Sequence, residues 1–200
     1  VIQQTTDGGY IVAGSSYSID GDVTGNYGNG YADYWVVKLD VDGTLLWEKI
    51  LGGSETNVAN AIQQTTDGGY IVAGYSAAID PDWGEEPADY WIVKLNGNGT
   101  TAWQKTIGGS QDDVLKSIQQ TIDGGYILGG TTASPIGGDV TEVSRGSADY
   151  WIVKTDSGGN IQWDKTLGGA SLDELLCIQQ TSDAGYILGG WSSSDAGGDK

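Results

Sequence analysis

Short apolar runs separated by turn-forming residues fill this chain, and the second quarter shows the pattern most clearly. Each run is a few residues long, rich in β-branched and aromatic residues, and bounded by Gly, Asp or Asn, which is typical of strands. From this quarter into the next we expect strands at 61–66, 70–75, 89–95 and 101–107. Asp67-Gly68-Gly69 and Asn98-Gly99 supply the tight turns between them, the second as a type I′ hairpin.

The same pattern repeats along the chain. Ile-Gln-Gln-Thr begins at Ile2, Ile62, Ile118 and Ile178, at spacings of 60, 56 and 60 residues. Between these marks recur Asp-Tyr-Trp, then Trp-x-Lys, then Gly-Gly. The repeated aspartates are Asp33, Asp89 and Asp149, and the repeated tryptophans are Trp35, Trp91, Trp151, Trp47, Trp103 and Trp163.

A four-stranded unit in tandem predicts an all-β, β-propeller-like array of antiparallel blades. An open solenoid of the same units is the alternative, although solenoid coils usually repeat at roughly 20 to 30 residues. We expect one array, with blade 1 at 1–60, blade 2 at 61–116, blade 3 at 117–176 and half of a fourth blade at 177–200. This count of three and a half units predicts a part of a longer propeller or of a filament.

Composition and charge narrow the classes of partner. The chain has 34 glycines, and its net charge is -18. A field of this sign repels phosphate backbones, so nucleic acid is not an expected partner. No apolar run approaches the roughly 18 residues of a membrane span. The single Cys177 aligns with Ala61 and Ser117 and is expected to be a small core residue.

Several motifs resemble the repeats of large secreted bacterial propeller proteins, many of which are type IX secretion substrates. The segments that carry the resemblance are Ser117–Gly130, Asp33–Asp40 and Trp47–Ser54. The resemblance covers essentially the whole chain and implies a secreted or cell-surface location. No sorting domain of that pathway is among these residues, so the export route is implied by the resemblance alone.

Catalysis is not expected. The chain has no histidine, which removes Ser-His and Cys-His nucleophile pairs and histidine metal ligands. A carboxylate glycoside hydrolase would need an acidic pair such as Asp22 with Asp33. Similar pairs recur in the other units, as Asp82 with Asp89 and Asp139 with Asp149, and an active site is rarely copied into every blade.

Calcium is the one cofactor that the loops suggest. Asp20, Gly21 and Asp22 begin like an EF-hand loop, but the twelfth position is Tyr31 instead of Glu. The candidate ligands over three loops are Asp20, Asp22, Asp80, Asp82 and Asp139. The alternative is that these aspartates form turns by bonding their own backbone.

Two tryptophans stand outside the repeated strand positions and are candidate carbohydrate platforms, namely Trp83 and Trp191. The repeated tryptophans are expected in the core. The repeated Asp and Lys residues, such as Asp33 and Lys38, are expected to form charge ladders between blades. One glutamine of each Gln-Gln pair is expected to face the channel or a blade interface, with a hydrogen-bond partner there.

These observations predict an extracellular structural or adhesive module that assembles with itself or with further repeats, with calcium as its one candidate cofactor. The alternative is a propeller module that binds a polysaccharide through its loops, with or without calcium. A carboxylate hydrolase is the third and least favoured class.

Overall fold

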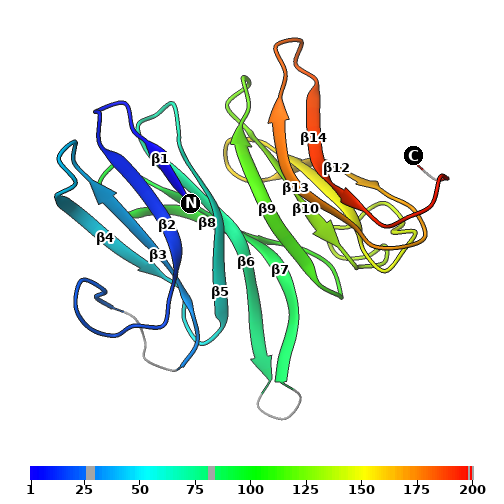
Figure 1. The fold of residues 1–200 in the computed structure, drawn as a ribbon, viewed down its shortest axis with the longest axis horizontal. Helices are drawn as coiled ribbons and strands as arrows, with labels where there is room; N and C mark the ends of the chain where they lie inside the picture. The colour runs from blue at the N-terminus through cyan, green and yellow to red at the C-terminus, as the bar shows by residue number, and fades with distance from the viewer. Residues whose placement is uncertain (26–29, 81–83, 198, 200) are drawn as a thin grey trace. The chain divides into compact units, whose positions relative to one another are not determined.

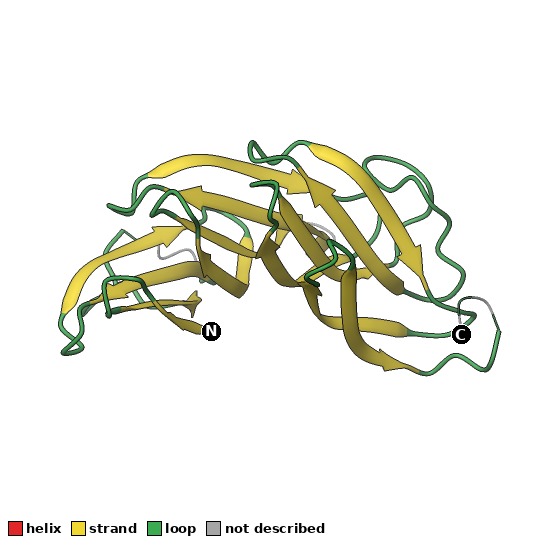
Figure 2. Ribbon diagram, turned by 90° about the horizontal axis from the view of Figure 1, so that it is seen from above, coloured by secondary structure: helices red, strands yellow, loops and turns green. Residues whose placement is uncertain are grey.

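The computed structural model describes all residues except 26–29, 81–83, 198 and 200, and its described residues form strands and loops with no helix (Figures 1 and 2). The strands are β1 (Ile2–Gln4), β2 (Tyr10–Ser16), β3 (Asp33–Leu39), β4 (Leu45–Leu51), β5 (Thr56–Gln64), β6 (Tyr70–Asp80), β7 (Gly84–Leu95), β8 (Thr101–Ile107), β9 (Asp113–Gln120), β10 (Tyr126–Thr132), β11 (Asp149–Thr155), β12 (Ile161–Leu167), β13 (Asp173–Gln180) and β14 (Tyr186–Ser192).

The strands form tandem antiparallel meanders, which confirms the predicted β-propeller-like class. Blade 1 has the strand order β1-β2-β3-β4, blade 2 β5-β6-β7-β8, and blade 3 β9-β10-β11-β12. The last sheet has two strands, β13 and β14, and is called the half-blade below. The chain divides into two compact units, of which the first covers 1–86 and 92–104 and the second covers 87–91 and 105–200.

The predicted strand positions hold, whereas their ends differ. In blade 2, β6 extends to Asp80 and β7 begins at Gly84, so much of the expected variable loop is strand. First strands also begin earlier than the repeat motif suggests, at Thr56, Asp113 and Asp173. These added residues reach the preceding blade, as described below.

The hairpin turns differ from the predicted type I′. In the β3–β4 turn, Gly43 has a φ of 83°, whereas none of the other residues of this turn has a positive φ. The Gly43 N–H donates to the Asp40 carbonyl at 3.2 Å, and Asp40 N–H donates to Thr44 O at 2.9 Å. This is a type I turn followed by a left-handed glycine. The Asp40 side chain stabilises it by accepting from the N–H groups of Asp42 and Thr44.

Each unit has its own buried core where neighbouring sheets meet. In the second unit, Ile127 and Ile152 of blade 3 pack against Leu175 and Ile178 of the half-blade. Alternation along a strand therefore sends one set of side chains toward the following blade and the other set toward the preceding blade. In the described residues no helix is long and apolar enough to cross a membrane.

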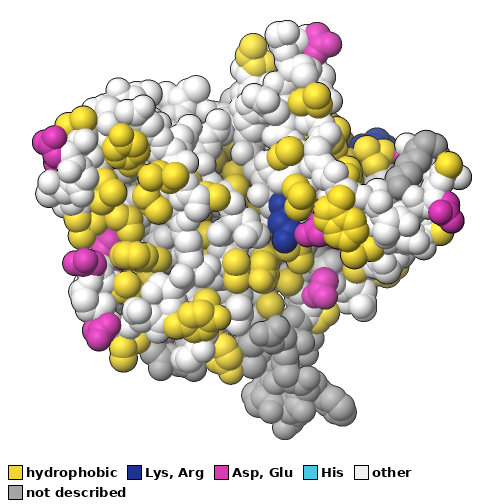
Figure 3. Space-filling model, in the orientation of Figure 1, with side chains coloured by type: hydrophobic (Ala, Val, Ile, Leu, Met, Phe, Trp, Pro, Cys, Tyr) yellow, Lys and Arg dark blue, Asp and Glu magenta, His cyan; other side chains and the backbone are white. Residues whose placement is uncertain are grey.

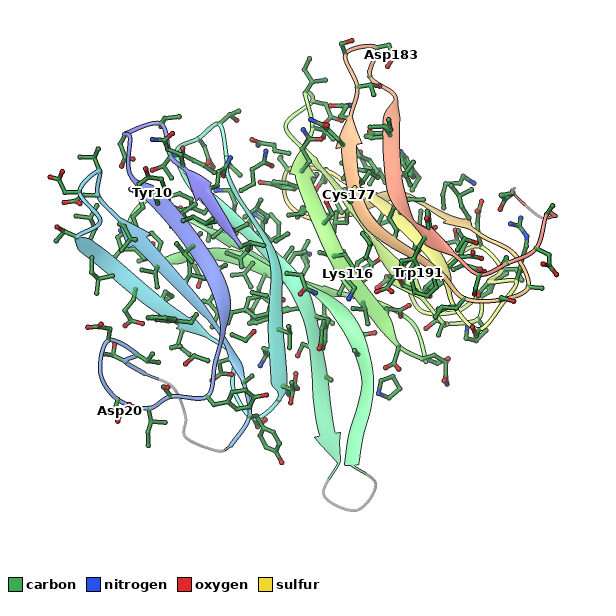
Figure 4. The ribbon with its side chains drawn as sticks, in the orientation of Figure 1. Tyr10, Asp20, Lys116, Cys177, Asp183 and Trp191 are labelled. Atoms are coloured by element: carbon green, nitrogen blue, oxygen red, sulfur yellow. The ribbon has the colours of Figure 1, made fainter. Side chains whose placement is uncertain are left out.

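Cys177 corrects one expectation, because it is exposed instead of buried. It lies on β13 (Figure 4), and its Sγ contacts the Gly189 carbonyl of β14 at 3.5 Å. The neighbouring residues Leu175 and Ile178 point to blade 3 and are buried. Cys177 lines a surface pocket together with Ile187 of β14 and Ile118 of β9.

Candidate functional site

The boundary between blades 2 and 3 is built on a tyrosine and a tryptophan from successive third strands. Tyr90 and Trp151 are fully buried, and their ring centroids are 4.7 Å apart. The Tyr90 hydroxyl donates to the Trp151 carbonyl at 3.0 Å. Burial raises the pKa of Tyr90 well above its ordinary value, so the phenol keeps its proton and remains a donor.

A glycine of the next blade makes room for this tyrosine. A Cβ added to Gly130 would lie 2.7 Å from the Tyr90 hydroxyl. Gly74 stands in the same relation to Tyr34 at 2.8 Å, and Gly190 to Tyr150 at 2.6 Å. A glycine in a strand interior commonly marks such a close approach. The repeated glycine is therefore required both by this tyrosine and by a backbone carbonyl of its own first strand, which a Cβ would meet at 1.9 to 2.1 Å.

At the boundary between blade 3 and the half-blade, the described residues supply Tyr150 and Gly190 but no third strand beside β14. A cavity of about 220 Å³ lies here. Its lining residues are Tyr150, Leu167, Gly168, Asp173, Leu188, Ser192 and Asp199. One repeat earlier, the indole of Trp151 packs on Tyr90 at the corresponding place. The cavity thus has the position of a tryptophan socket.

Glutamines link successive first strands, as predicted for one residue of each pair. Gln3 Oε1 accepts from Gln64 N–H at 2.6 Å, and Gln64 Oε1 accepts from Thr6 N–H at 2.8 Å. Gln119 and Gln180 repeat the arrangement in the second unit, with Gln119 Oε1 accepting from Gln180 N–H at 2.6 Å. Each pair of bonds uses the first glutamine of one blade and the second glutamine of the next blade.

Carboxyl groups gather around the Gly-Gly step that joins blade 2 to blade 3. Asp139 Oδ2 accepts from Gly108 N–H at 3.2 Å, and Asp113 Oδ2 accepts from Gly109 N–H at 2.7 Å. Asp89 lies against the same glycine, since a Cβ on Gly108 would meet its carboxyl group. Burial, followed by the charges of Asp113 and Asp139, raises the pKa of Asp89 to about 6. Chemically, this cluster can take up a proton near neutral pH.

At the boundary between blades 1 and 2, the side-chain amide of Asn57 stands in place of one of these carboxyl groups. Asn57 Nδ2 donates to Asp33 Oδ1 at 3.3 Å, and Gly53 N–H donates to the same oxygen at 3.1 Å. Burial still raises the pKa of Asp33, although these two donors oppose the rise. Asp33 thus bridges to the next blade through a neutral partner, whereas Asp89 faces charged neighbours.

The repeated lysines of the third strand pair within a blade, which differs from the expected ladder between blades. Lys38, Lys94 and Lys154 are nearly buried, and each contacts the aspartate of the first hairpin turn in its own sheet. The Nζ–Oδ2 distances are 3.0 Å to Asp7, 2.9 Å to Asp67 and 2.9 Å to Asp123. The bond from Thr121 and then the bond from Lys154 lower the pKa of Asp123 to about 2.

The repeated tryptophans have two different environments. Trp91 and Trp151 are core residues, whereas Trp163 of the fourth strand is 37% exposed. Trp163 stacks edge to face on Tyr186 of the half-blade at 5.9 Å, and Trp47 does the same with Tyr70 at 5.8 Å. Trp47 and Trp163 therefore lie at the rim of a blade boundary, and the prediction of a core position is wrong for Trp163.

The described members of the predicted calcium ligands lie in different surroundings. Asp20 and Asp22 are exposed in a loop of the first unit, and Asp139 belongs to the carboxyl cluster at Gly108. Asp80 ends β6, and Asp82 lies outside the described residues, as does Trp83. In the part of the chain that the structure describes, no group of three or more acidic, Cys or His side chains is arranged to hold a metal ion.

Trp191 lies at the surface with two charged residues, on strand β14 and not in a loop as the polysaccharide alternative expected. It is 44% exposed, and its Nε1–H donates to Glu174 Oε2 at 3.0 Å. Glu174 Oε1 also pairs with Lys116 Nζ at 3.3 Å. Figure 4 shows Lys116 and Trp191 close together over β9 and β14, and Figure 3 shows basic, acidic and apolar side chains adjoining on this face.

Comparisons with known proteins give distant similarities. No family model matches the chain. It is 24% identical over 164 residues to Regulatory protein FlaEY from Caulobacter vibrioides (strain ATCC 19089 / CIP 103742 / CB 15), covering 76% of this chain and 17% of that protein. It is also similar, with 13% identity and a TM-score of 0.27, to a solved protein of unknown function from Bacteroides caccae, covering 86% of this chain and 70% of that one. The chain thus spans less than a fifth of the length of FlaEY.

Proposed function

We propose that this chain is an extracellular structural or adhesive module whose blades associate end to end with further blades of the same kind. The observation that carries the proposal is the outer face of blade 1. Gly74, Gly130 and Gly190 each lie under a tyrosine of the preceding blade, whereas no described atom lies within 4 Å of a Cβ built on Gly14. A further blade of the same kind would place its tyrosine over Gly14 in the same way.

The opposite end of the array supports the same proposal. On the half-blade, Ile187 is 61% exposed, although its counterpart Ile127 in blade 3 is completely buried. Side chains of this row face the following blade in blade 3, where Ile127 packs against Leu175 and Ile178. A further blade would cover Ile187 in the same manner. The net charge of -18 keeps such a repetitive sheet protein soluble before assembly.

Electron microscopy of the purified chain tests the proposal directly. We expect regular polymers, which are lost in Gly14→Leu because the added side chain blocks the receiving face. The leucine should not disturb the blade itself, since its Cβ meets no atom. Val41→Ser, in an exposed turn of the same blade, is the matched control and should still assemble.

Discrete monomers of the wild-type chain at high concentration would reject the assembly role. A chelator addresses the calcium hypothesis in the same experiment. Loss of polymers on chelation, with recovery on adding Ca²⁺, would assign a cation to the loops. Unchanged polymers would leave the aspartates of those loops as turn residues.

Glycan binding is the second candidate, and the exposed Trp191 favours it. An indole face beside Lys116 and Glu174 can stack on a sugar ring while the charged groups bond its hydroxyls. A polysaccharide array followed by titration would test this role. Binding that falls about tenfold or more in Trp191→Ala, but not in Trp163→Ala, would support it, and equal binding by both variants would reject it.

A further inference from the structure

We infer that the half-blade binds a β-hairpin that carries the third- and fourth-strand pattern of this repeat. The hairpin would add to the edge of β14, and its tryptophan would enter the cavity beside Tyr150. This inference rests on the structural role proposed above and names the partner of one end. Three separate features of the half-blade fit the same occupant.

The first feature is the edge of β14. In blade 3, β10 pairs with β9 on one side and with β11 on the other, over seven residues from Tyr126↔Thr155 to Thr132↔Asp149. In the described residues β14 pairs only with β13. Its other row of backbone N–H and C=O groups is therefore available to a further strand, and strand addition is a common mode of recognition.

The second feature is the socket at Tyr150. In blade 3, Trp151 lies over Tyr90, and its backbone carbonyl accepts the Tyr90 hydroxyl. Tyr150 is only partly buried, and no third-strand carbonyl stands beside its hydroxyl in the described residues. The indole N–H needs nothing from the half-blade, because Trp151 Nε1 donates to Asp164 of its own hairpin at 3.0 Å.

The third feature is a carboxylate without its lysine. Asp123 in the β9–β10 turn is paired with Lys154 of the third strand at 2.9 Å. Asp183 holds the same place in the β13–β14 turn (Figure 4) and bonds Thr181 and Gly185. No lysine contacts it in the part of the chain described by the structure. A hairpin of the repeat pattern would bring a lysine to this carboxylate.

The edge, the socket and the carboxylate are in register with one another. In blade 3, Trp151 lies opposite Gly130, and Lys154 lies opposite Ile127. The corresponding residues of β14 are Gly190 and Ile187, which carry the same spacing. An unrelated extended segment would use the edge alone, so the repeat's own Asp-Tyr-Trp hairpin is the occupant that satisfies all three.

The test uses the full chain and a synthetic peptide of residues 147–168, which contains β11 and β12. We expect saturable binding in titration calorimetry, with peptide Trp151→Ala weakened about tenfold or more. On the chain, Tyr150→Phe should weaken binding about fivefold through the lost hydroxyl bond, and Asp183→Asn about twofold. Thermal melts of both variants should match the wild type, because neither side chain has its third-strand partner in the free chain.

A chain with the hairpin covalently attached shows whether a negative peptide titration reflects only low affinity. Copying residues 141–168 once more directly after Lys200 preserves the 60-residue spacing and raises the effective hairpin concentration to about millimolar. We expect a higher melting temperature and protection of the β14 amides from hydrogen exchange. Tyr150→Phe in the extended chain should now lower the melting temperature.

Several results would overturn the inference. These are absence of binding together with unprotected β14 amides in the extended chain, equal affinity of the wild-type and Trp151→Ala peptides, or equal affinity for the wild-type and Tyr150→Phe chains. The outcome is distinguishable from that of the assembly role. Hairpin binding without polymers in micrographs would retain this inference and reject end-to-end assembly. Polymers that form without hairpin binding would retain end-to-end assembly and reject this inference.

Discussion

Blade 3 and the half-blade carry nearly the same first two strands in different surroundings. Ile127 is fully buried and Ile187 is mostly exposed, although both follow the tyrosine that begins the second strand. Asp123 has a lysine partner, and Asp183 bonds only groups of its own turn. The hairpin therefore folds to the same register in both places. Its burial and charge pairing come from the strands and blades around it.

The largest expected difference between the two hairpins concerns apolar burial. Ile127→Ala should lower the free energy of unfolding by about 3 kcal/mol, since it leaves a cavity against Leu175 and Ile178. Ile187→Ala should cost less than about 1 kcal/mol, because that side chain is mostly in water. Chemical denaturation of both variants measures this. Equal losses would mean that another part of the chain covers Ile187.

Charge pairing should give the next largest difference. Asp123→Asn keeps the threonine and glycine bonds but leaves Lys154 as a nearly buried charge without a counterion, at a cost of about 2 to 3 kcal/mol. Asp183→Asn removes no lysine partner and should cost less than about 0.5 kcal/mol.

The pH dependence of the Asp123–Lys154 ion pair can be measured by thermal melts of Asp123→Asn and wild type in acid. The pKa of Asp123 is lowered to about 2, so its stabilisation is complete above the ordinary pKa of about 4 and is lost as the pH falls through about 2. The difference between Asp123→Asn and wild type should therefore shrink in strong acid. A constant difference across that range would contradict the ion pair.

A smaller effect should separate the two kinds of carboxyl boundary. Folding raises the pKa of Asp89 to about 6, so the native state binds the proton more tightly than the unfolded chain. Its contribution is fully favourable below pH 4 and is lost as the pH rises through about 6. Asp89→Asn should thus raise stability at pH 7 to 8 by about 1 kcal/mol, reduced by partial solvent screening, with little effect at pH 4.

Asp33→Asn is the matched variant at the first boundary. Asp33 receives bonds from Asn57 and Gly53 that oppose the rise of its pKa, so Asp33→Asn should raise the melting temperature at pH 7 to 8 by less than Asp89→Asn does. Melting curves of both variants between pH 4 and 8 measure the contrast. Equal stabilisation by Asp33→Asn and Asp89→Asn, or a pH-independent effect of Asp89→Asn, would show that the acidic neighbours of Asp89 do not govern its titration.

The smallest expected effect lies in the turns of the two hairpins. Ala184 has a φ of 67°, where Gly124 of blade 3 has 82°. Ala184→Gly should stabilise the chain by about 0.5 kcal/mol, since relief of the left-handed strain is partly offset by the greater freedom of the unfolded glycine. Gly124→Ala should destabilise it by about 1 kcal/mol. Thermal melts with the same sign for both changes would contradict this account.

The sequence predicted the strand order well because turn chemistry and strand pattern are local. The Asp-Gly-Gly and Asp-Gly steps mark hairpins whatever surrounds them, and glycines such as Gly68 and Gly43 have the positive φ that was expected. The type I′ prediction was wrong, since the loops have a third residue that the dipeptide alone does not reveal. The early starts of β5, β9 and β13 were missed because Asn57, Asp113 and Asp173 are polar.

The contacts between blades were harder to predict, because they depend on which face each side chain takes. The glutamine at a blade interface was predicted from alternation, but its bond to a backbone N–H required the offset between first strands. The lysine was assigned to a neighbouring blade, whereas the strand register places it beside its own first turn. A usable signal for the tyrosine contact was present in the glycine repeated at Gly74, Gly130 and Gly190.

The facing of the tyrosine and tryptophan also gives the array a polarity. On each third strand the tyrosine side chain faces the following blade and the tryptophan side chain faces the preceding blade, as Tyr90 and Trp151 show. The two sides of a blade are therefore different surfaces, and their contact is heterologous. A heterologous contact cannot produce a symmetric pair. It continues until the series closes on itself or meets a unit that lacks one of the two faces.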